Sequence, residues 1–319
     1  MERRTLLSLG SINADFQVRV DASPGSAETL LGHAFVRLSG GKASNTAFLG
    51  ARFGHCSLLL GRVGDDDLAE QALAPLREAG VDVSAVGRVP GHATGVSLIM
   101  VPPDAKKQIV LATNANDCWD EAALDALRRA VEQAPPPACL VLDYEVPARA
   151  VRTAVLAAER CGMPVVLDPS FADRAERELF GKLRALVPNA AEGGALAGID
   201  ISDLESARRA ARQLQREGVP LVALKLSDGG CVLATGEGLW HLPGGAVDPV
   251  DATGAGDAFT GALAIALLEG APPLEAALWG VAAAQAAVTG YGSQPAYPQR
   301  DDLMKRVEDL RSKVRRCDD

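Results

Sequence analysis

Residues 139–168 read CLVLDYEVPARAVRTAVLAAERCGMPVVLD and predict a strand, a helix and a second strand. The apolar run 139–142 has the length of a short buried strand, and 165–167 has the same character. Between them, Ala148–Arg160 is predicted to be a helix that ends before Gly162. Strands joined by a helix in this way lie parallel in one sheet, so the segment predicts an α/β fold.

The same alternation of apolar runs and helical segments continues on both sides. Further helices are predicted at 46–52, 67–79, 121–133, 203–217, 258–269 and 301–314, and further strands at 6–9, 183–187 and 221–226. The alternation predicts a three-layer αβα fold, in which a mainly parallel central sheet lies between helices. Ligands bind such sheets beyond the carboxyl ends of the strands. The polar stretches that follow predicted strands are 143–145, Asp168, Asn189 and 225–227.

Two segments, at about 11–38 and 94–113, break this alternation because they are predicted to be strands with no helix between them. We expect them to form a small β-sheet that lies as a lid over the strand ends. Val96, Leu98 and Met100 would share one apolar face of this sheet, because successive side chains of a strand alternate. The alternative is that both segments add edge strands to the main sheet.

Residues 250–257, VDATGAGD, form the most informative loop of the chain. Small residues at a helix start leave backbone N–H groups free to bind a phosphate or the charge that develops on one. Asp257 falls in the first helical turn, where a carboxylate is placed to accept the proton of an attacking hydroxyl. One alternative is a plain helix start, with Asp257 favoured by the helix dipole. Another, a dinucleotide-binding loop, fails because Gly254 and Gly256 lack the third glycine of that fingerprint.

A second glycine loop, SGGKASN at 39–45, precedes the first predicted helix. It is not a Walker A loop, because Val36 stands where that motif needs its first glycine. Adjacent glycines let a small polar ligand approach the backbone, and Lys42 and Asn45 offer hydrogen bonds to it. The alternative is a simple helix start with Ser44 or Asn45 as its cap.

Asn13 and Asp15 follow the strand at 6–9 and lie two residues apart on an extended segment. Their side chains would therefore face the same side. An amide and a carboxylate so placed suit a ligand with several hydroxyl groups, since hydroxyls need both acceptors and donors. An Asx turn is the alternative.

The composition limits the classes of function. Hydrophobic residues make up 48% of the 319, and the net charge of −9 argues against nucleic acid or an anionic membrane as the main partner. No apolar run approaches the ~20 residues that span a bilayer, and the N-terminal stretch has no secretory signal pattern. The six cysteines form no C-x-x-C pair, and the four histidines show no metal-binding spacing. We therefore expect a cytoplasmic protein without a zinc site.

These motifs together resemble the ribokinase-like, PfkB-type family of carbohydrate kinases. The resemblance covers about residues 6–298. Both signature regions of the family are present, at 40–54 and 251–261, with an N-x-x-E motif at 189–192 between them. The resemblance implies one ribokinase-like kinase domain over 1–319, with the lid segments inserted.

Within the family, GSINAD at 10–15 and GGKASN at 40–45 have the form of the ribokinase branch. The resemblance therefore implies transfer of the γ-phosphoryl group of ATP to a primary hydroxyl of a small neutral sugar, with D-ribose as the first choice. The same-fold alternatives are kinases of a ketohexose, of 2-keto-3-deoxygluconate or of a nucleoside, whose base could stack on Tyr144. A sugar-binding regulator without catalysis is the alternative from another class.

The family's site residues are carried over by position. Those implied for the acceptor are Asn13, Asp15, Gly41, Lys42, Asn45, Glu145 and Asp257. Those implied for phosphoryl transfer are Asp257 as the base and the amides of Gly254, Ala255 and Gly256 as the anion hole. Those implied for ATP are Asn189, Lys225, Ser227, Asp228, Gly230 and Gly256.

Two metal ions are implied by the resemblance. Mg²⁺ would be ordered with the triphosphate by Glu192, acting through water. A K⁺ site would map to Asp251, Thr253, Ala287, Gly290 and Gly292. The family expects a side-chain hydroxyl at position 296, where this chain has alanine.

Two residues depart from the family pattern, since Ala252 and Lys225 both stand where threonine is usual. The acceptor is expected to be neutral, because Asp15 and Glu145 are two acids facing one base, Lys42. The resemblance also implies a homodimer, in which the apolar faces of two lid sheets pack together.

Overall fold

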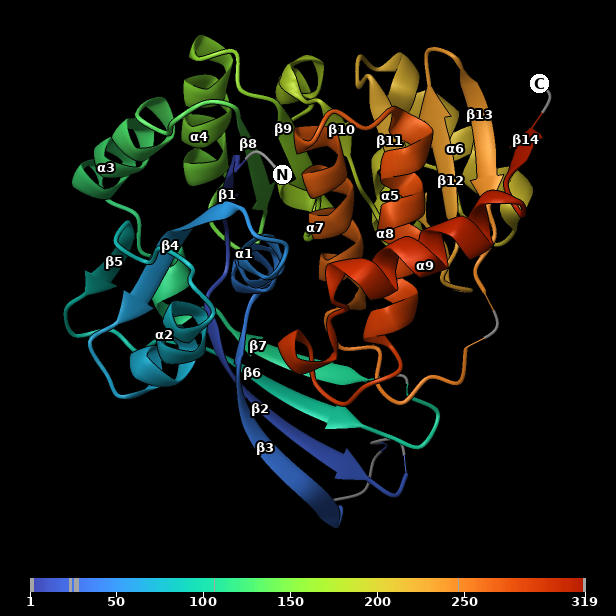
Figure 1. The fold of residues 1–319 in the computed structure, drawn as a ribbon. Coiled ribbons are helices and arrows are strands. Elements are labelled where there is room, and N and C mark those ends of the chain that lie inside the picture. The colour runs from blue at the N-terminus through green and yellow to red at the C-terminus, as the bar shows by residue number, and fades with distance from the viewer. Residues whose placement is uncertain (1–2, 23–24, 26–28, 106, 246, 318–319) are drawn as a thin grey trace.

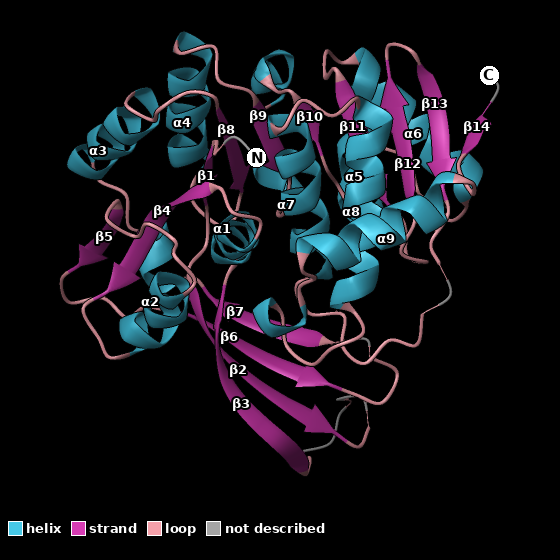
Figure 2. Ribbon diagram, viewed as in Figure 1, coloured by secondary structure: helices cyan, strands magenta, loops and turns pink. Residues whose placement is uncertain are grey.

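The structure is a computed structural model that describes residues 3–22, 25, 29–105, 107–245 and 247–317. A ten-stranded sheet lies between two layers of helices, and a four-stranded sheet stands beside it (Figure 1, Figure 2). The predicted three-layer αβα fold with a small lid sheet is confirmed.

Parallel strands make up most of the main sheet. Its members are β1 (Thr5–Leu9), β4 (Cys56–Gly64), β5 (Val86–Val89), β8 (Ala138–Asp143), β9 (Val165–Asp168), β10 (Ala185–Leu186), β11 (Leu221–Lys225), β12 (Cys231–Thr235), β13 (Gly238–Leu242) and β14 (Arg315–Cys317). They follow the order β14-β13-β12-β11-β10-β9-β8-β1-β4-β5. The strands from β11 to β5 in this order are parallel, and β12, β13 and β14 extend the sheet as an antiparallel edge.

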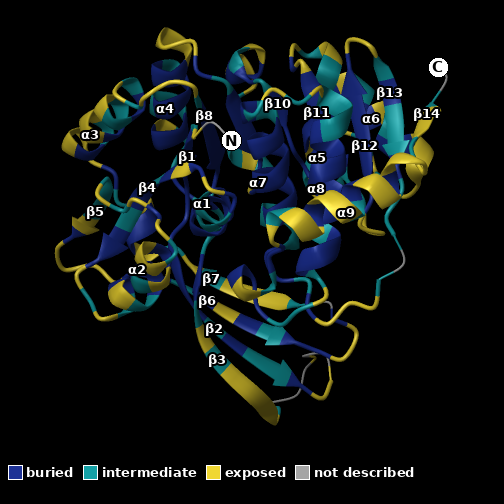
Figure 3. Ribbon diagram, in the orientation of Figure 1, coloured by how far each residue is buried: buried dark blue, intermediate teal, exposed yellow. Residues whose placement is uncertain are grey.

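Helices cover both faces of the main sheet, and each layer of helices packs against the sheet in a separate hydrophobic core (Figure 3). One layer holds α1 (Lys42–Arg52), α7 (Ala255–Leu268), α8 (Pro273–Ala287) and α9 (Arg300–Arg311), with α2 (Leu68–Glu78) beside α1. The other holds α3 (Glu121–Glu132), α4 (Ala148–Arg160), α5 (Ala190–Ala197) and α6 (Leu204–Arg216). Short 3₁₀ helices lie at Asn114–Asp117, Ala172–Arg174, Arg177–Lys182 and Gln294–Ala296. None of the helices in the described ranges is long and apolar enough to cross a membrane.

Two helices begin earlier than predicted, and both do so directly after a glycine. α1 starts at Lys42 instead of 46, and α7 starts at Ala255 instead of 258. Gly41 and Gly254 are their N-caps, with φ of 95° and 73°, a region open to glycine at little cost. Ser44 and Asn45 therefore lie inside α1 and do not cap it, so that alternative is wrong.

The lid is a sheet of its own. It consists of β2 (Asn13–Val20), β3 (Gly32–Gly40), β6 (Gly95–Val101) and β7 (Gln108–Ala112), in the order β3-β2-β6-β7. The alternative that these segments extend the main sheet is wrong. Residues 23–24 and 26–28 of the first predicted lid segment, and residue 106 of the second, lie outside the described residues.

The two faces of the lid differ in burial. Val96, Leu98 and Met100 share the outward face, as predicted, and Leu98 is 50% exposed. On β2, the side chains of Asn13, Asp15 and Gln17 are buried. One face of the lid therefore turns polar groups toward the main sheet, and the other leaves apolar groups in contact with solvent.

Candidate active site

A cavity of about 690 Å³ lies at the carboxyl ends of the parallel strands, with lid residues Ile99, Ile109 and Leu111 forming part of its wall. It brings together all of the residues predicted for the acceptor, ATP and phosphoryl transfer, with two of those predicted for metal ions. The predicted residues that line it are Asn13, Asp15, Gly41, Lys42, Asn45, Glu145, Asn189, Glu192, Lys225, Ser227, Asp228, Gly230, Thr253, Gly254, Ala255, Gly256 and Asp257.

The loop before α7 is held in shape from behind. A Cβ atom on Gly254 would lie 2.5 Å from Cβ of Ser293, so a side chain does not fit there. The hydroxyl of Tyr297 donates a hydrogen bond to the Gly254 carbonyl oxygen (2.9 Å). The first residues of α7 line the cavity, where unpaired helix-start amides can bind an anion.

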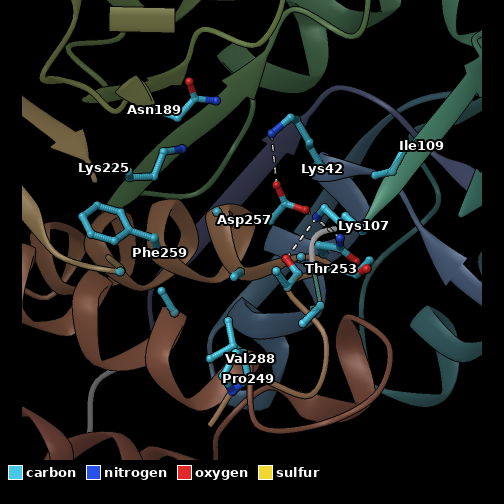
Figure 4. Close-up of a pocket in the computed structure, with 18 of the residues that line it drawn as sticks. Lys42, Lys107, Ile109, Asn189, Lys225, Pro249, Thr253, Asp257, Phe259 and Val288 are labelled. Carbon is cyan, nitrogen blue, oxygen red and sulfur yellow. Dashed lines mark hydrogen bonds and ion pairs between the residues drawn. The ribbon is translucent and has the colours of Figure 1, made fainter. Parts of the chain in front are cut away.

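Both carboxylate oxygens of Asp257 have a donor, and Figure 4 shows the contact with Lys42. Oδ1 lies 3.2 Å from Nζ of Lys42, and Oδ2 accepts a hydrogen bond from Nδ2 of Asn45 (2.7 Å). The amide of Asn45 is itself oriented, because its Oδ1 accepts from Nε2 of Gln294 (3.1 Å). These contacts fix the direction of the Asp257 carboxylate, and they place Asn45 as a support for it.

A buried ion cluster joins the ends of β9 and β11 to α1 and α7. Asp168 lies 2.8 Å from Nζ of Lys225 and 3.3 Å from Nζ of Lys42, and the hydroxyl of Thr260 donates to it (3.0 Å). Burial opposes ionisation of Asp168, but Lys225 and Lys42 outweigh it and hold the pKa of this carboxyl well below its usual value. The sequence predicts that Asp168 lies at this edge of the sheet, because it follows a strand. Its pairing with two lysines was not predicted.

Lys42 carries its charge between two acids. Burial disfavours the ammonium, but Asp168 and Asp257 hold the pKa of Lys42 well above its usual value. The side chain therefore remains cationic across the physiological pH range. The two ion pairs hold the ammonium group of Lys42 beside Asp168 and Asp257.

The end of the cavity lined by Asp15 and Glu145 is acidic and tightly packed. Burial, with the nearby charge of Glu145, raises the pKa of Asp15 to about 7 against a hydrogen bond from Ser97. A Cβ atom on Gly40 would lie 2.0 Å from Oδ2 of Asp15, so this glycine is required by the position of the carboxylate. Glu145 accepts a hydrogen bond from the hydroxyl of Ser11 (2.6 Å).

Asn13 is oriented by a residue that the sequence analysis did not identify. Its Oδ1 accepts a hydrogen bond from Nδ2 of Asn116 (2.9 Å), and Oδ1 of Asn116 accepts from the backbone N–H of Ile12 (3.0 Å). Asn116 lies in a 3₁₀ turn after β7, and no motif marks it. The contact leaves the Asn13 amide N–H₂ as the group offered to the cavity.

The N-x-x-E motif forms the start of α5. Oδ1 of Asn189 accepts from the Glu192 amide (2.9 Å), and Oε2 of Glu192 accepts from the Asn189 amide (2.8 Å). This reciprocal pair is a capping box, so both side chains have a structural task as well as a place in the cavity wall. Burial and the charge of Asp168 raise the pKa of Glu192.

A lysine of the lid contacts the loop at 250–257, which we call the anion loop. Lys107 lies just before β7, and its Nζ donates to the carbonyl oxygen of Ala252 (3.0 Å; Figure 4). Burial lowers the pKa of Lys107, and the charge of Asp257 opposes that shift. The sequence analysis missed this residue, because a lysine in the predicted turn of a hairpin is usually solvated. The predicted count of one base, Lys42, near the acceptor residues therefore omits Lys107, and Lys225 is a third lysine of the same cavity.

Of the residues implied for K⁺, only Thr253 lines the cavity; the other four, which lie outside its wall, are Asp251, Ala287, Gly290 and Gly292. Asp251 is fully buried and makes hydrogen bonds to neutral donors through both oxygens. Tyr144 was considered as a stacking partner for a nucleoside base, and this is wrong. Its ring is buried in the core, and its hydroxyl accepts from the Glu176 amide (3.3 Å).

The family model of the pfkB family carbohydrate kinases matches residues 3–300. The chain belongs to this family. The ribokinase of Haemophilus influenzae is 31% identical to this kinase over 306 residues, which is 96% of this chain and 99% of that protein. The deoxyribokinase of Salmonella typhi is 30% identical over 291 residues, which is 91% of this chain and 94% of that protein.

A solved structure gives the same result for the fold. The structure of Arabidopsis thaliana ribokinase complexed with ribose and ATP superposes on this kinase with a TM-score of 0.81 and 28% identity, covering 96% of this chain and 99% of that one. The family resemblance drawn from the motifs is confirmed. The protein is a sugar kinase, a phosphotransferase with an alcohol group as acceptor.

Proposed function

We propose that this kinase transfers the γ-phosphoryl group of ATP to the primary hydroxyl of D-ribose, giving ribose 5-phosphate. The observation that carries the proposal is one shared cavity, lined by Asn13 and Asp15 from the lid and by Asp257 from α7. The Arabidopsis ribokinase, which has the same fold, is described in complex with ribose and ATP. This supports the same pair of substrates for this kinase. A cytoplasmic location also remains a prediction.

In the proposed transfer, each group of the cavity has a role. Asp257 accepts the proton of the attacking hydroxyl, since Lys42 and Asn45 fix the direction of its carboxylate. The amides at the start of α7 stabilise the charge that spreads over the phosphoryl oxygens in the transition state. Asn13, Asp15 and Glu145 hold the other hydroxyls of the sugar, so that the reacting one faces the base.

The nucleotide end of the cavity fits a magnesium ion. Mg²⁺ is usually held by one or two carboxylates, water and substrate phosphates, and Glu192 offers one carboxylate in the cavity wall, held in place by the hydrogen bond that its Oε2 accepts from the Asn189 amide. Glu192, with Asn189, would order the ion and its waters. When bound with ATP, the ion neutralises charge on the phosphates.

The Glu192→Gln variant should require a higher Mg²⁺ concentration for half-maximal activity, while the KM for the sugar changes little. Glutamine is a poorer ligand for a hard cation, yet it can still accept from the Asn189 amide and so preserve the start of α5. Titrating Mg²⁺ at saturating sugar and ATP measures the shift. Loss of sugar affinity at saturating Mg²⁺ would contradict the assignment.

We propose a neutral acceptor, although Lys107 adds a second base. Lys42 shares its charge between Asp168 and Asp257, and Lys107 donates to the anion loop, so both cations lie toward the phosphoryl group. Asp15 and Glu145 remain at the proposed acceptor end, where a substrate carboxylate would meet like charge at pH values above the Asp15 pKa of about 7.

An ADP-release assay tests the proposed substrate. The panel is D-ribose, 2-deoxyribose, fructose, 2-keto-3-deoxygluconate and adenosine, and kcat/KM should be highest for ribose. The Asp257→Asn variant, purified in the same way, serves as the control for contaminating kinases. Preference for the acidic sugar would overturn the charge argument, and preference for fructose would overturn only the choice of sugar.

The pH dependence of acceptor use should depend on Asp15. Below a pKa of about 7 the carboxyl is neutral, and above it the carboxylate is the stronger acceptor for a sugar hydroxyl, so kcat/KM for ribose should rise from pH 6 to 8. The Asp15→Asn variant should lose this rise and show a KM for ribose raised by roughly 10–100-fold. A variant with the wild-type pH profile would show that another group titrates.

We also propose that the lid sheets of two copies pack together in a homodimer. Leu98 pairs across the sheet with Phe16 and Val110, and the ring of Phe16 stacks on Phe35 at 6.2 Å. Leu98, Val110 and Phe35 are each at least half exposed, and a second copy offers a matching apolar face.

Light scattering should give about twice 33.1 kDa for the wild type. The Leu98→Glu variant should move toward the monomer mass, because a charge in a paired apolar face is costly. The Leu204→Glu variant, which changes an exposed leucine of α6 outside the lid, is the control and should keep the wild-type mass. A wild type that stays monomeric at micromolar concentration contradicts the proposal.

A further inference from the structure

The carboxylate of Asp251, at the start of the anion loop, is completely satisfied by neutral donors. Oδ1 accepts from the backbone amide (2.8 Å) and the hydroxyl (2.6 Å) of Thr253. Oδ2 accepts from Nε2 of Gln17 (2.7 Å) and from the backbone amide of Gly292 (2.9 Å). A carboxylate has about four lone-pair positions, and all four are used.

Gln17 is the one donor of this set that comes from the lid. Its side chain is fully buried, which is unusual for a glutamine and indicates a specific partner. It lies on β2 two residues after Asp15, and alternate residues of a strand share a face. The strand that supplies the acceptor-binding carboxylate therefore also holds the loop that binds the transferred phosphoryl group.

The residues implied for K⁺ do not fit a cation well in this chain. A monovalent ion beside Asp251 needs an oxygen with a free lone pair, but the N–H₂ group of Gln17 is directed at Oδ2. Position 296, where the family expects a hydroxyl ligand, is an alanine, and a Cβ atom on Gly290 would lie 2.6 Å from its methyl group. The site thus has a donor in contact with its carboxylate and lacks one ligand oxygen.

We propose that the Gln17 amide takes the place of a monovalent cation, so that the loop from Asp251 to Gly256 keeps its shape without K⁺. A buried carboxylate must be compensated, and here the lid supplies one of the four hydrogen bonds that compensate it. Gln17 is a positioning residue: it acts through Asp251 on the amides of the loop and touches no substrate. The kinetic consequence of the inference rests on the proposed transfer to D-ribose, and its ion-binding consequence does not.

The wild-type protein provides the first test. Its kcat/KM should differ less than twofold between KCl and tetramethylammonium chloride at equal ionic strength, and its unfolding temperature should be the same in both salts. A K⁺ activation of tenfold or more, or a K⁺-specific rise in unfolding temperature, would overturn the proposal. The thermal measurement needs no substrate, so its result stands even if ribose is not the acceptor.

The Gln17→Leu variant provides the second test. Without the amide, kcat in tetramethylammonium chloride should fall roughly 10–100-fold, and K⁺ should restore part of it and raise the unfolding temperature by a few degrees. A purely structural role for Gln17 would give a loss that K⁺ does not reverse, and this outcome would also overturn the proposal. Val18→Ala, a neighbouring change on the opposite face of β2, is the control and should show no K⁺ response. If Gln17→Leu does not fold, the wild-type ion measurements decide the question.

Discussion

The Asp257→Asn variant should turn over about 10²–10⁴-fold more slowly than the wild type while it binds ATP and the acceptor sugar almost as well. Asparagine keeps the size of the side chain but cannot take a proton from the attacking hydroxyl. In the wild type, Lys42 and Asn45 hold both oxygens of this carboxylate and so fix its direction. Steady-state ADP release gives kcat, and calorimetric titration gives the two affinities.

A second carboxylate of the cavity supplies the matched control. Asp228 lies at the nucleotide end, and its Oδ1 accepts from the Gly230 amide (2.9 Å). Asp228→Asn should change the KM for ATP and leave kcat near the wild-type value. A turnover above a tenth of the wild type in Asp257→Asn would remove Asp257 from the role of base.

The Asp168→Ala variant should lose about 3–5 kcal/mol of the free energy of unfolding as well as its activity. The substitution leaves the ammonium groups of Lys42 and Lys225 buried without their shared partner. Breaking one side of a buried ion cluster costs more than the cluster contributes in total, because the remaining charge keeps its desolvation penalty. Urea unfolding followed by circular dichroism measures the loss.

An exposed ion pair is the control for this experiment. Glu70 pairs with Arg77 and Arg88 on the surface, where water screens the charges. Glu70→Gln should therefore leave the unfolding midpoint nearly unchanged. A loss in Asp168→Ala no larger than that of Glu70→Gln would show that the two lysines find other compensation.

Much of the fold follows from local patterns. The helices α3, α4 and α6 each have one polar face, and they begin and end within a residue or two of the predicted positions. Apolar spacing marks all three, and side-chain caps also mark the starts of α3 and α6. α8 has no such signal, since it is buried along most of its length and no polar face reveals its period. The antiparallel edge of β12, β13 and β14 was not predicted either, because pairing across a sheet depends on contacts that a local pattern does not contain.

The site shows the same division. The strand ends and glycine loops that the sequence indicates contribute residues to one cavity, although not every residue of these stretches lines it. The contacts between them were not predictable: Gln17, Lys107 and Asn116 act across long separations in sequence, and each of them has an ordinary solvated alternative. A charge count made from motifs alone therefore missed one cation.

The glycine caps of α1 and α7 bear on how catalysis responds to amino-acid substitutions. Both helices begin at the wall of the cavity, and each N-terminus carries a partial positive charge of roughly half an elementary charge from its aligned peptide groups. An electric field made by backbone dipoles does not titrate and cannot be oxidised. Directed evolution of the lid residues that line the cavity, with Gln17 kept, would therefore leave the field at the transferred group in place.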